Sequence, residues 1–469
     1  AAMRELVGRS WSAGGDAMQV EHLVRGIEDG SLSDLTHLDL SNCKMSELPR
    51  QVCSLSSLEM LNLGGNHLSS LPDSIGGLVS LKILFFLGNC FERIPSCIKS
   101  LHNLETLSFK SNRLVEVDDV LPCSLKALIL TNNKIAELPR SIGQLRRLQK
   151  LMLAQNCLKT IPEELADCEG LELIRLANNR LEALPERLLL LPSLSWIGLA
   201  GNEHLTCSPH NNAKTYSMQD LEMYEQIGRG ASGCVYRALL RSSGAAVAVK
   251  VFHEEAMISD GSPWDEIAIA SSVSCEDVQR LIGVVREPKL AAITPLAPRA
   301  SKILAHPPSL ASITRDVYVR NAADAADTSD TIVDPISLKA VVAFAYAMAN
   351  GLRALHEAGI CHGDFYAHNI LVEPSSLWAC LLDFGASFCF NRDPAKAPLP
   401  VDLLLRLEVL AYGRLLKELL DMADGVTEAT DLDAMDSLQQ LAEMCKSPDV
   451  RSRPDMSSVC KYFEVKNLR

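Results

Sequence analysis

Apolar residues in the first half of the chain recur in one fixed phrase, L-x-x-L-x-L-x-x-N, in which another large apolar residue sometimes replaces a leucine. The residues at its ninth position are Cys43, Asn66, Asn89, Asn112, Asn133, Asn156, Asn179 and Asn202. They are spaced by 23 residues, except for an interval of 21 between Asn112 and Asn133. Independent amphipathic strands or helices do not explain a fixed period, so the pattern predicts a repeated unit with a short strand at each L-x-L.

The chemistry of the phrase explains why such units stack. Alternate leucines of a short strand point to one side, and the Asn side chain can bond free backbone groups along the following turn. No single unit can bury its apolar face, so the eight copies must stack into a curved solenoid. The pattern resembles the leucine-rich repeat. We therefore predict a solenoid of about eight repeats over residues 31–207, preceded by an N-terminal cap or extension over residues 1–30.

The variable positions of the strands face the concave side of such a solenoid. Large apolar residues at these positions are Ile83, Phe85, Ile129, Met152, Leu173 and Trp196. We expect them to be more exposed than core leucines such as Leu84 and Leu151. Six at equivalent positions would form a contiguous patch, and patches of this kind are typical of protein interfaces. The sequence therefore predicts a protein partner on the concave face.

A polar stretch over residues 208–217 reads as a linker, and a glycine-rich phrase, IGRGASGCVY, follows at 227–236. Gly228, Gly230 and Gly233 form G-x-G-x-x-G, whose backbone can approach phosphates closely. This phrase alone also fits a dinucleotide site, but such a site requires a helix that begins at the glycines. The strand-like segments CVYRALL and AAVAVKVF follow instead. They predict a β-hairpin that leads into a strand carrying Lys250.

Further motifs follow in a fixed order. ICHGDFYAHNILV contains Asp364 and Asn369, LLDFGAS contains Asp383, and VRSRPDM stands near the end of the chain. Together with the glycine phrase and Lys250, the set resembles the eukaryotic protein kinase over about residues 218–465. The predicted fold class is an α/β leucine-rich-repeat solenoid followed by an α+β bilobal protein-kinase fold.

The resemblance implies roles for individual residues. Asp364 would orient the hydroxyl of a protein substrate, Lys250 would hold the α- and β-phosphates of ATP, and Asn369 and Asp383 would bind Mg²⁺. The residues implied in binding ATP are Gly228, Gly230, Gly233, Val235, Ala248, Lys250, Glu266, Leu371 and Asp383.

Lys250 requires a carboxylate partner on the next helix. Glu266 is the favoured candidate, because the apolar Ile267, Ala270 and Val273 after it fit a buried helical face. The alternatives are Asp265, Glu254 and Glu255.

Some positions depart from the family pattern. Gly363 replaces the arginine of H-R-D, and Tyr366 replaces the lysine expected two residues after Asp364. His368 is an alternative donor to the phosphate. The segment after Gly385 contains no A-P-E and reaches Glu408, in the phrase typical of the next helix, after about 22 residues. The predicted function is phosphorylation of a protein hydroxyl, of Ser or Thr rather than Tyr. The alternative is a pseudokinase scaffold that binds nucleotide and partners without phosphoryl transfer.

Composition narrows the class of protein. The formal net charge of −13 argues against nucleic-acid binding by bulk charge. No run of 18 uncharged apolar residues occurs, so we expect no membrane span. The fifteen cysteines are scattered without metal-ligand spacing, which is typical of reduced thiols in a cytoplasmic protein.

Overall fold

The computed structural model describes residues 10–207, 213–230, 232–253, 262–318, 331, 335–391, 399–424 and 429–468. The chain divides into two compact units, Ala1–Leu194 and Ser195–Arg469, and each is described by itself.

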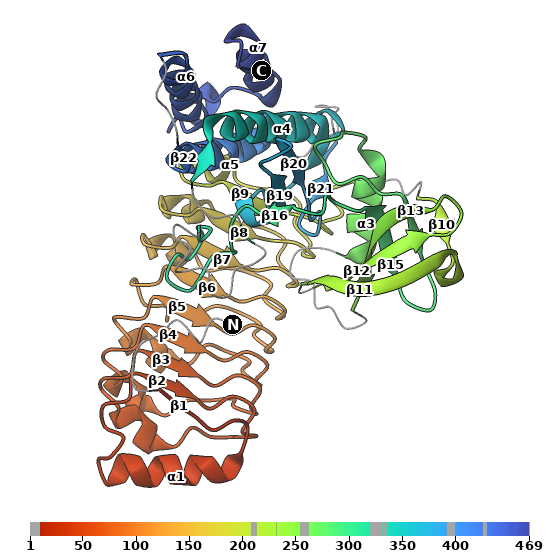
Figure 1. Ribbon diagram of the computed structural model, residues 1–469. Coiled ribbons are helices and arrows are strands. Elements are labelled where there is room, and N and C mark those ends of the chain that lie inside the picture. The colour runs from red at the N-terminus through yellow and green to blue at the C-terminus, as the bar shows by residue number, and fades with distance from the viewer. Residues whose placement is uncertain are drawn as a thin grey trace. The chain divides into compact units, whose positions relative to one another are not determined.

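The first unit is a ladder of three-residue strands (Figure 1). Its strands are β1 (Ser10–Ser12), β2 (His37–Asp39), β3 (Met60–Asn62), β4 (Ile83–Phe85), β5 (Thr106–Ser108), β6 (Ala127–Ile129), β7 (Lys150–Met152) and β8 (Leu173–Arg175). Each pairs in parallel with the next. The strand order of this leucine-rich-repeat sheet has a ninth member, β9 (Trp196–Gly198), which belongs to the second unit. β1 lies ahead of the repeats seen in the sequence, in the segment predicted as a cap, and helix α1 (Ala17–Glu28) follows it.

Short helices connect the strands on the return path of each repeat. They are η2 (Arg50–Ser54), η3 (Asp73–Gly77), η4 (Ser96–Ser100), η5 (Arg140–Gln144), η6 (Glu163–Asp167) and α2 (Glu186–Leu189). A proline immediately precedes each of them. The missing proline N–H costs nothing there, because the first N–H groups of a helix have no partner within it. In the fully described stretch between β5 and β6, turns replace the helix, which accounts for the 21-residue interval.

The repeated asparagines bond the backbone of two neighbouring repeats. Asn112 is buried, and its Nδ2 donates to the carbonyl oxygens of Phe86 at 2.8 Å and Phe109 at 3.1 Å. Its Oδ1 accepts from the Phe91 N–H at 3.1 Å. The three phenylalanine rings pack together with centroids 4.7–5.2 Å apart. The Asn side chain thus supplies hydrogen bonds to backbone groups of the turn, while the three phenylalanine rings form part of the apolar core.

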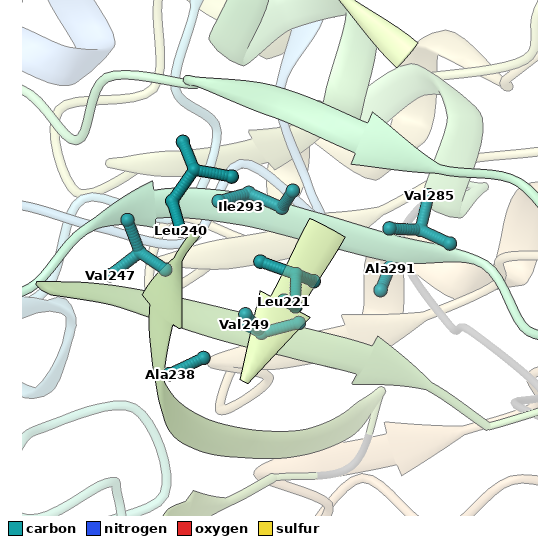
Figure 2. Close-up of a cluster of buried hydrophobic side chains, with 8 residues drawn as sticks. All are labelled: Leu221, Ala238, Leu240, Val247, Val249, Val285, Ala291 and Ile293. Carbon is teal, nitrogen blue, oxygen red and sulfur yellow. The ribbon is translucent and has the colours of Figure 1, made fainter. Parts of the chain in front are cut away.

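The second unit contains a six-stranded mixed sheet. Its members are β10 (Thr215–Tyr216), β11 (Leu221–Arg229), β12 (Gly233–Leu240), β13 (Ala245–Phe252), β14 (Gly283–Val285) and β15 (Ala291–Pro295). The strand order is β10-β14-β15-β13-β12-β11, and β10 pairs in parallel with β14. Helix α3 (Pro263–Ser272) follows β13 in the chain. Figure 2 shows one apolar cluster of this sheet, formed by Leu221, Ala238, Leu240, Val247, Val249, Val285, Ala291 and Ile293.

The rest of the second unit is mainly helical. Its helices are η7 (Met218–Asp220), α4 (Leu338–Glu357), η8 (Ala367–Asn369), α5 (Val401–Asp421), α6 (Ala429–Cys445), η9 (Val450–Ser452) and α7 (Met456–Val465). Its short strands are β16 (Lys302–Ile303), β17 (Ile336–Ser337), β18 (Ile360–Cys361), β19 (Ile370–Glu373), β20 (Trp378–Leu381), β21 (Phe388–Cys389) and β22 (Ala423–Asp424). Among the described helices, α4 is long and apolar enough to cross a membrane, but 61% of its apolar stretch is buried inside the protein, as in the core helix of a globular domain.

Candidate active site

The glycine-rich phrase forms the turn between β11 and β12. The two strands are antiparallel, with Gly228 opposite Val235, so a hairpin follows the glycines as predicted and no helix opens there. A Cβ on Gly233 would lie 2.4 Å from the Val251 carbonyl oxygen, so only glycine fits at that position. Among the residues that the structure describes, a Cβ on Gly230 would meet no atom within 4 Å, which leaves space for a ligand to approach the backbone there.

Lys250 lies on the face of β13 opposite the apolar cluster that contains Val247 and Val249 (Figure 2). Val247 and Val249 are fully buried, while Ala248 and Lys250 alternate with them on the other face. Val235 of β12 pairs with Lys250, so these candidate nucleotide-binding residues occupy adjacent positions on one sheet. Leu371 lies on β19, where it pairs with Ile303 and Cys380.

Glu266 of α3 is the partner of Lys250. The Lys250 Nζ lies 2.6 Å from the Glu266 Oε1, and the Glu266 residue is only 9% exposed. Burial raises the pKa of Glu266, and the charge of Asp383 adds to the rise, while the Lys250 ammonium opposes it. The alternative Asp265 instead caps the N-terminus of α3 by bonding Ser262. Glu254 and Glu255 lie outside the described residues.

Asp364 lies in the loop between β18 and η8. The Asn369 Nδ2 donates to the Asp364 carbonyl oxygen at 2.8 Å and to its Oδ2 at 3.0 Å. The preceding His362 is buried, with Nε2 3.0 Å from the Leu382 carbonyl oxygen. The Asp364 carboxylate is therefore held by Asn369, which belongs to the same sequence motif.

Asp383 is exposed and has a left-handed backbone, with φ of 57°. Its Oδ1 accepts from the Gly385 N–H at 3.0 Å, which fixes the side chain over its own turn. The charge of Asp383 acts on both Glu266 and His368. The sheet, α3 and the two loops thus bring Lys250, Glu266, Asp364 and Asp383 to one region of the second unit.

Gly363 adopts a conformation that the family arginine would not favour. Its φ is +73°, and a Cβ would lie 2.6 Å from the Ala386 carbonyl oxygen and 3.1 Å from that of Ile197. Its N–H donates to the Glu408 Oε1 at 2.7 Å, and the Glu408 Oε2 lies 2.8 Å from the His356 Nε2. The backbone of this position is therefore held by α5.

Tyr366 and His368 occupy defined environments on either side of Ala367. Tyr366 is 5% exposed, so it is packed into the protein at the position where the family pattern has a lysine. The backbone N–H of His368 donates to Asp316 at 3.0 Å, and its Nδ1 lies 2.7 Å from the same carboxylate. Burial acts to lower the pKa of His368, but Asp316, Asp364 and Asp383 raise it overall.

Two contacts of the loop were missed by sequence reasoning. Asp316 stands 52 residues before His368, within no motif. Trp196 is 4% exposed and packs on the loop after Asp364, so the expectation that it lies on an open concave face is wrong. Leu173 is also 4% exposed, whereas Ile83, Phe85, Ile129 and Met152 are half-buried. The only signal for Trp196 was a large aromatic residue at a variable repeat position.

Known families match both parts of the chain. The protein kinase domain family matches residues 221–399, a leucine-rich repeat region matches residues 19–121, and a leucine rich repeat matches residues 123–181. The chain therefore carries a leucine-rich-repeat region followed by a protein kinase domain.

Curated relatives are distant. A probable serine/threonine-protein kinase of Dictyostelium discoideum is 28% identical over 176 residues, 37% of this chain and 11% of the relative. Mitogen-activated protein kinase kinase kinase 10 of Homo sapiens is 27% identical over 288 residues, 52% of this chain and 28% of the relative. The chain thus spans less than a third of the length of either relative. A leucine-rich-repeat protein of Leptospira interrogans is 32% identical, with a TM-score of 0.37 over 39% of this chain and 47% of that structure.

Proposed function

We propose that the protein is an ATP- and Mg²⁺-dependent kinase that phosphorylates protein hydroxyls, on Ser or Thr rather than Tyr. The observation that carries the proposal is the 2.6 Å pair between Lys250 and Glu266, formed in the same unit as the Asp364–Asn369 hydrogen bonds. Phosphoryl transfer depends almost entirely on positioning and electrostatic stabilisation, and these two pairs supply both.

The residues present fit a nucleotide with its metal ion. The open space beside Gly230 admits phosphates to the turn, and the 20% exposed Lys250 side chain carries the charge to bind them. The Asn369 amide nitrogen donates to Asp364, so its amide oxygen is the atom suited to a metal. The Asn369 backbone carbonyl oxygen accepts from the N–H of Leu382 at 2.8 Å, and the exposed Asp383 is the next residue in the chain. Mg²⁺ commonly uses one or two carboxylates together with substrate phosphates. Bound ATP and Mg²⁺ would supply the transferable phosphoryl group and neutralise its charge.

The chain's own groups would then act as follows. Lys250, held by Glu266, orients the phosphates from the face of β13. Asp364 accepts a hydrogen bond from the substrate hydroxyl, and Asn369 keeps its carboxylate in place. His368 is held by Asp316, and the charges of Asp364 and Asp383 raise its pKa. Its imidazole would offer a hydrogen-bond donor to the phosphate in place of the family lysine.

The test is transfer of the γ-phosphate to Ser, Thr and Tyr peptides by the purified full chain. We expect Lys250→Met and Asp364→Asn each to lower transfer about 100-fold or more, because each removes a group that acts on the reacting atoms. Lys461→Met and Asp433→Asn, at exposed positions of α7 and α6, are matched controls and should retain full activity. Undiminished transfer in either site variant would refute the assignment.

The alternative function is a pseudokinase scaffold. Burial of Tyr366 favours it, because the ring occupies the position of a family lysine without any charge to offer. ATP binding without transfer by the unmutated chain would support this alternative.

Recruitment of a protein partner by the solenoid is part of the same proposal. The half-buried Ile83 and Phe85 on β4, together with Ile129 on β6 and Met152 on the adjacent β7, support it. We also propose a cytoplasmic location, which is supported by the fifteen cysteines, none of which forms a disulfide.

A further inference from the structure

Trp196 of β9 makes two specific contacts with the loop that carries Asp364. Its indole Nε1 donates to the Phe365 carbonyl oxygen at 2.8 Å. Its ring stacks on the Tyr366 ring, with centroids 4.1 Å apart and planes 10° from parallel. Phe365 and Tyr366 are the two residues immediately after Asp364, so one side chain fixes both the backbone and a ring of this loop.

Charged groups hold the tryptophan itself. The guanidinium of Arg315 lies 5.6 Å from the Trp196 ring centroid and that of Arg414 lies 5.1 Å from it, within the range of a cation–π interaction. Arg315 is followed by Asp316, which bonds His368 of η8, the short helix directly after the same loop. The loop is therefore restrained at two points by neighbouring elements.

The strand also contacts the residue before Asp364. The Ile197 carbonyl oxygen would lie 3.1 Å from a Cβ on Gly363, so the backbone of β9 passes where any side chain at this position would begin. β9 thus lies against the loop on both sides of Asp364, at Gly363 and at Phe365–Tyr366.

We propose that Trp196 is a positioning residue for phosphoryl transfer, which holds residues 364–366 so that the Asp364 carboxylate faces the substrate hydroxyl. This inference rests on the proposed kinase function. A misplacement of about 1 Å at a reacting group can cost about 100-fold in rate, so the orientation of this loop has direct kinetic weight. Trp196 touches neither the Lys250–Glu266 pair nor the glycine turn in any contact described above, so its effect should fall on turnover and leave nucleotide binding unchanged.

Two substitutions separate the contacts. Trp196→Phe keeps a ring to stack on Tyr366 but removes the indole N–H, and Trp196→Leu removes both contacts while retaining apolar bulk. We expect kcat to fall about fivefold in the first variant, the equivalent of one hydrogen bond, and at least tenfold in the second. The KM for ATP and the Kd for the nucleotide should change less than about twofold, because the hydrogen bond and the ring stack of Trp196 end at Phe365 and Tyr366. Trp11→Phe and Trp11→Leu, on β1, are the matched controls.

Hydrogen exchange of the loop amides gives a readout that needs no activity. In Trp196→Leu, amides within residues 364–369 should exchange at least tenfold faster, while those of α4 and β13 stay unchanged. If the unmutated chain transfers phosphate and the Leu variant keeps its kcat, the proposal is wrong. If the Leu variant melts at a lower temperature but keeps its kcat and the hydrogen exchange of its loop amides, the role of Trp196 is purely structural and the proposal is also wrong. If the unmutated chain transfers no phosphate, the kinase proposal fails, and loop exchange alone decides whether Trp196 orders the loop.

Discussion

At the scale of single residues, Gly363 shows why a departure from a family motif need not be a simple loss. Its positive φ and the approach of the Ala386 and Ile197 carbonyl oxygens favour a residue without a side chain, and its backbone N–H bonds Glu408. Neighbouring backbone atoms occupy the space that a side chain would need at this position, so Gly363→Arg would not restore the family arrangement.

We predict that Gly363→Ala destabilises the second unit more than a left-handed backbone alone explains. Gly244 has a similar φ of +68°, but a Cβ there would meet no atom within 4 Å. Gly244→Ala should therefore lower the free energy of unfolding by about 1 kcal/mol, the cost of a left-handed backbone for alanine. Gly363→Ala should cost about 2 kcal/mol more, because the methyl group meets backbone atoms that cannot rotate away. Urea unfolding of both variants measures the difference, and equal losses would contradict the steric argument.

At the scale of elements, the buried asparagines stabilise the repeats through backbone groups that have no strand partner. Asn112→Ala would leave the carbonyl oxygens of Phe86, Phe109 and Lys110, and also the Phe91 N–H, without the bonds they make to this side chain. We expect a loss of about 3 kcal/mol in the free energy of unfolding. The control is Asn103→Ala, an exposed residue with one bond to the Val79 carbonyl oxygen, which should cost less than about 1 kcal/mol. Denaturant titration followed by circular dichroism compares them.

Helix α5 carries a buried carboxyl group, and we predict that it makes stability depend on pH. Burial raises the pKa of Glu418 to about 7; Asp316 adds to the rise, while the Tyr318 hydroxyl, Arg315 and Arg414 oppose it. The group is ordinary in the unfolded chain, with a pKa near 4.5. The stability that the protonated Glu418 carboxyl contributes to folding is therefore fully present below about pH 4.5. It is lost as the pH rises through about 7, when the free energy of unfolding falls by roughly 3 kcal/mol.

Glu418→Gln should remove this pH dependence, because the amide stays neutral and its oxygen can still accept from Tyr318. The variant should gain stability relative to the unmutated protein between pH 5 and pH 8, as measured by melting temperature across that range. A constant difference at every pH would show that Glu418 does not titrate in this window.

How much of this could be predicted from the sequence differs between elements and contacts. The 23-residue period predicts the strands, because a repeat that stacks has to present the same leucines at the same interval. The Lys250–Glu266 pair was predictable, since a single helix follows β13 and its apolar face indicates which carboxylate is buried. Trp196 and Phe365 are 169 residues apart in the chain and share no motif, so only tertiary packing brings them together. β1 lies outside the repeated phrase, and its pairing comes from the exposed edge of β2.

At the scale of the whole molecule, regulation should differ from that of kinases that rely on a phosphorylated activation segment. Gly363 offers no cation at the position where the family places an arginine, and the atoms around it leave no room for one. Part of the segment between Gly385 and Glu408 lies outside the described residues. We predict that phosphatase treatment leaves kinase activity nearly unchanged. In the family, a phosphate on the activation segment pairs with the arginine that Gly363 replaces, so this ordering contact cannot form at that position. Assays before and after treatment test this, and a tenfold loss would refute it.

The membership of β9 in the second unit has a consequence for the evolution of such two-part proteins. The kinase family match begins at residue 221, yet residues before it carry Trp196 and also Cys207, whose N–H donates to the Cys389 carbonyl oxygen at 2.9 Å. A gene fusion or recombination event that exchanged the repeats at the polar linker would bring in a foreign strand beside Asp364. A crossover ahead of Ser195 would instead keep Trp196 together with the kinase-domain loop that it contacts. The last repeat would therefore be inherited with the kinase, and its variable positions would change with the catalytic loop rather than with the other repeats.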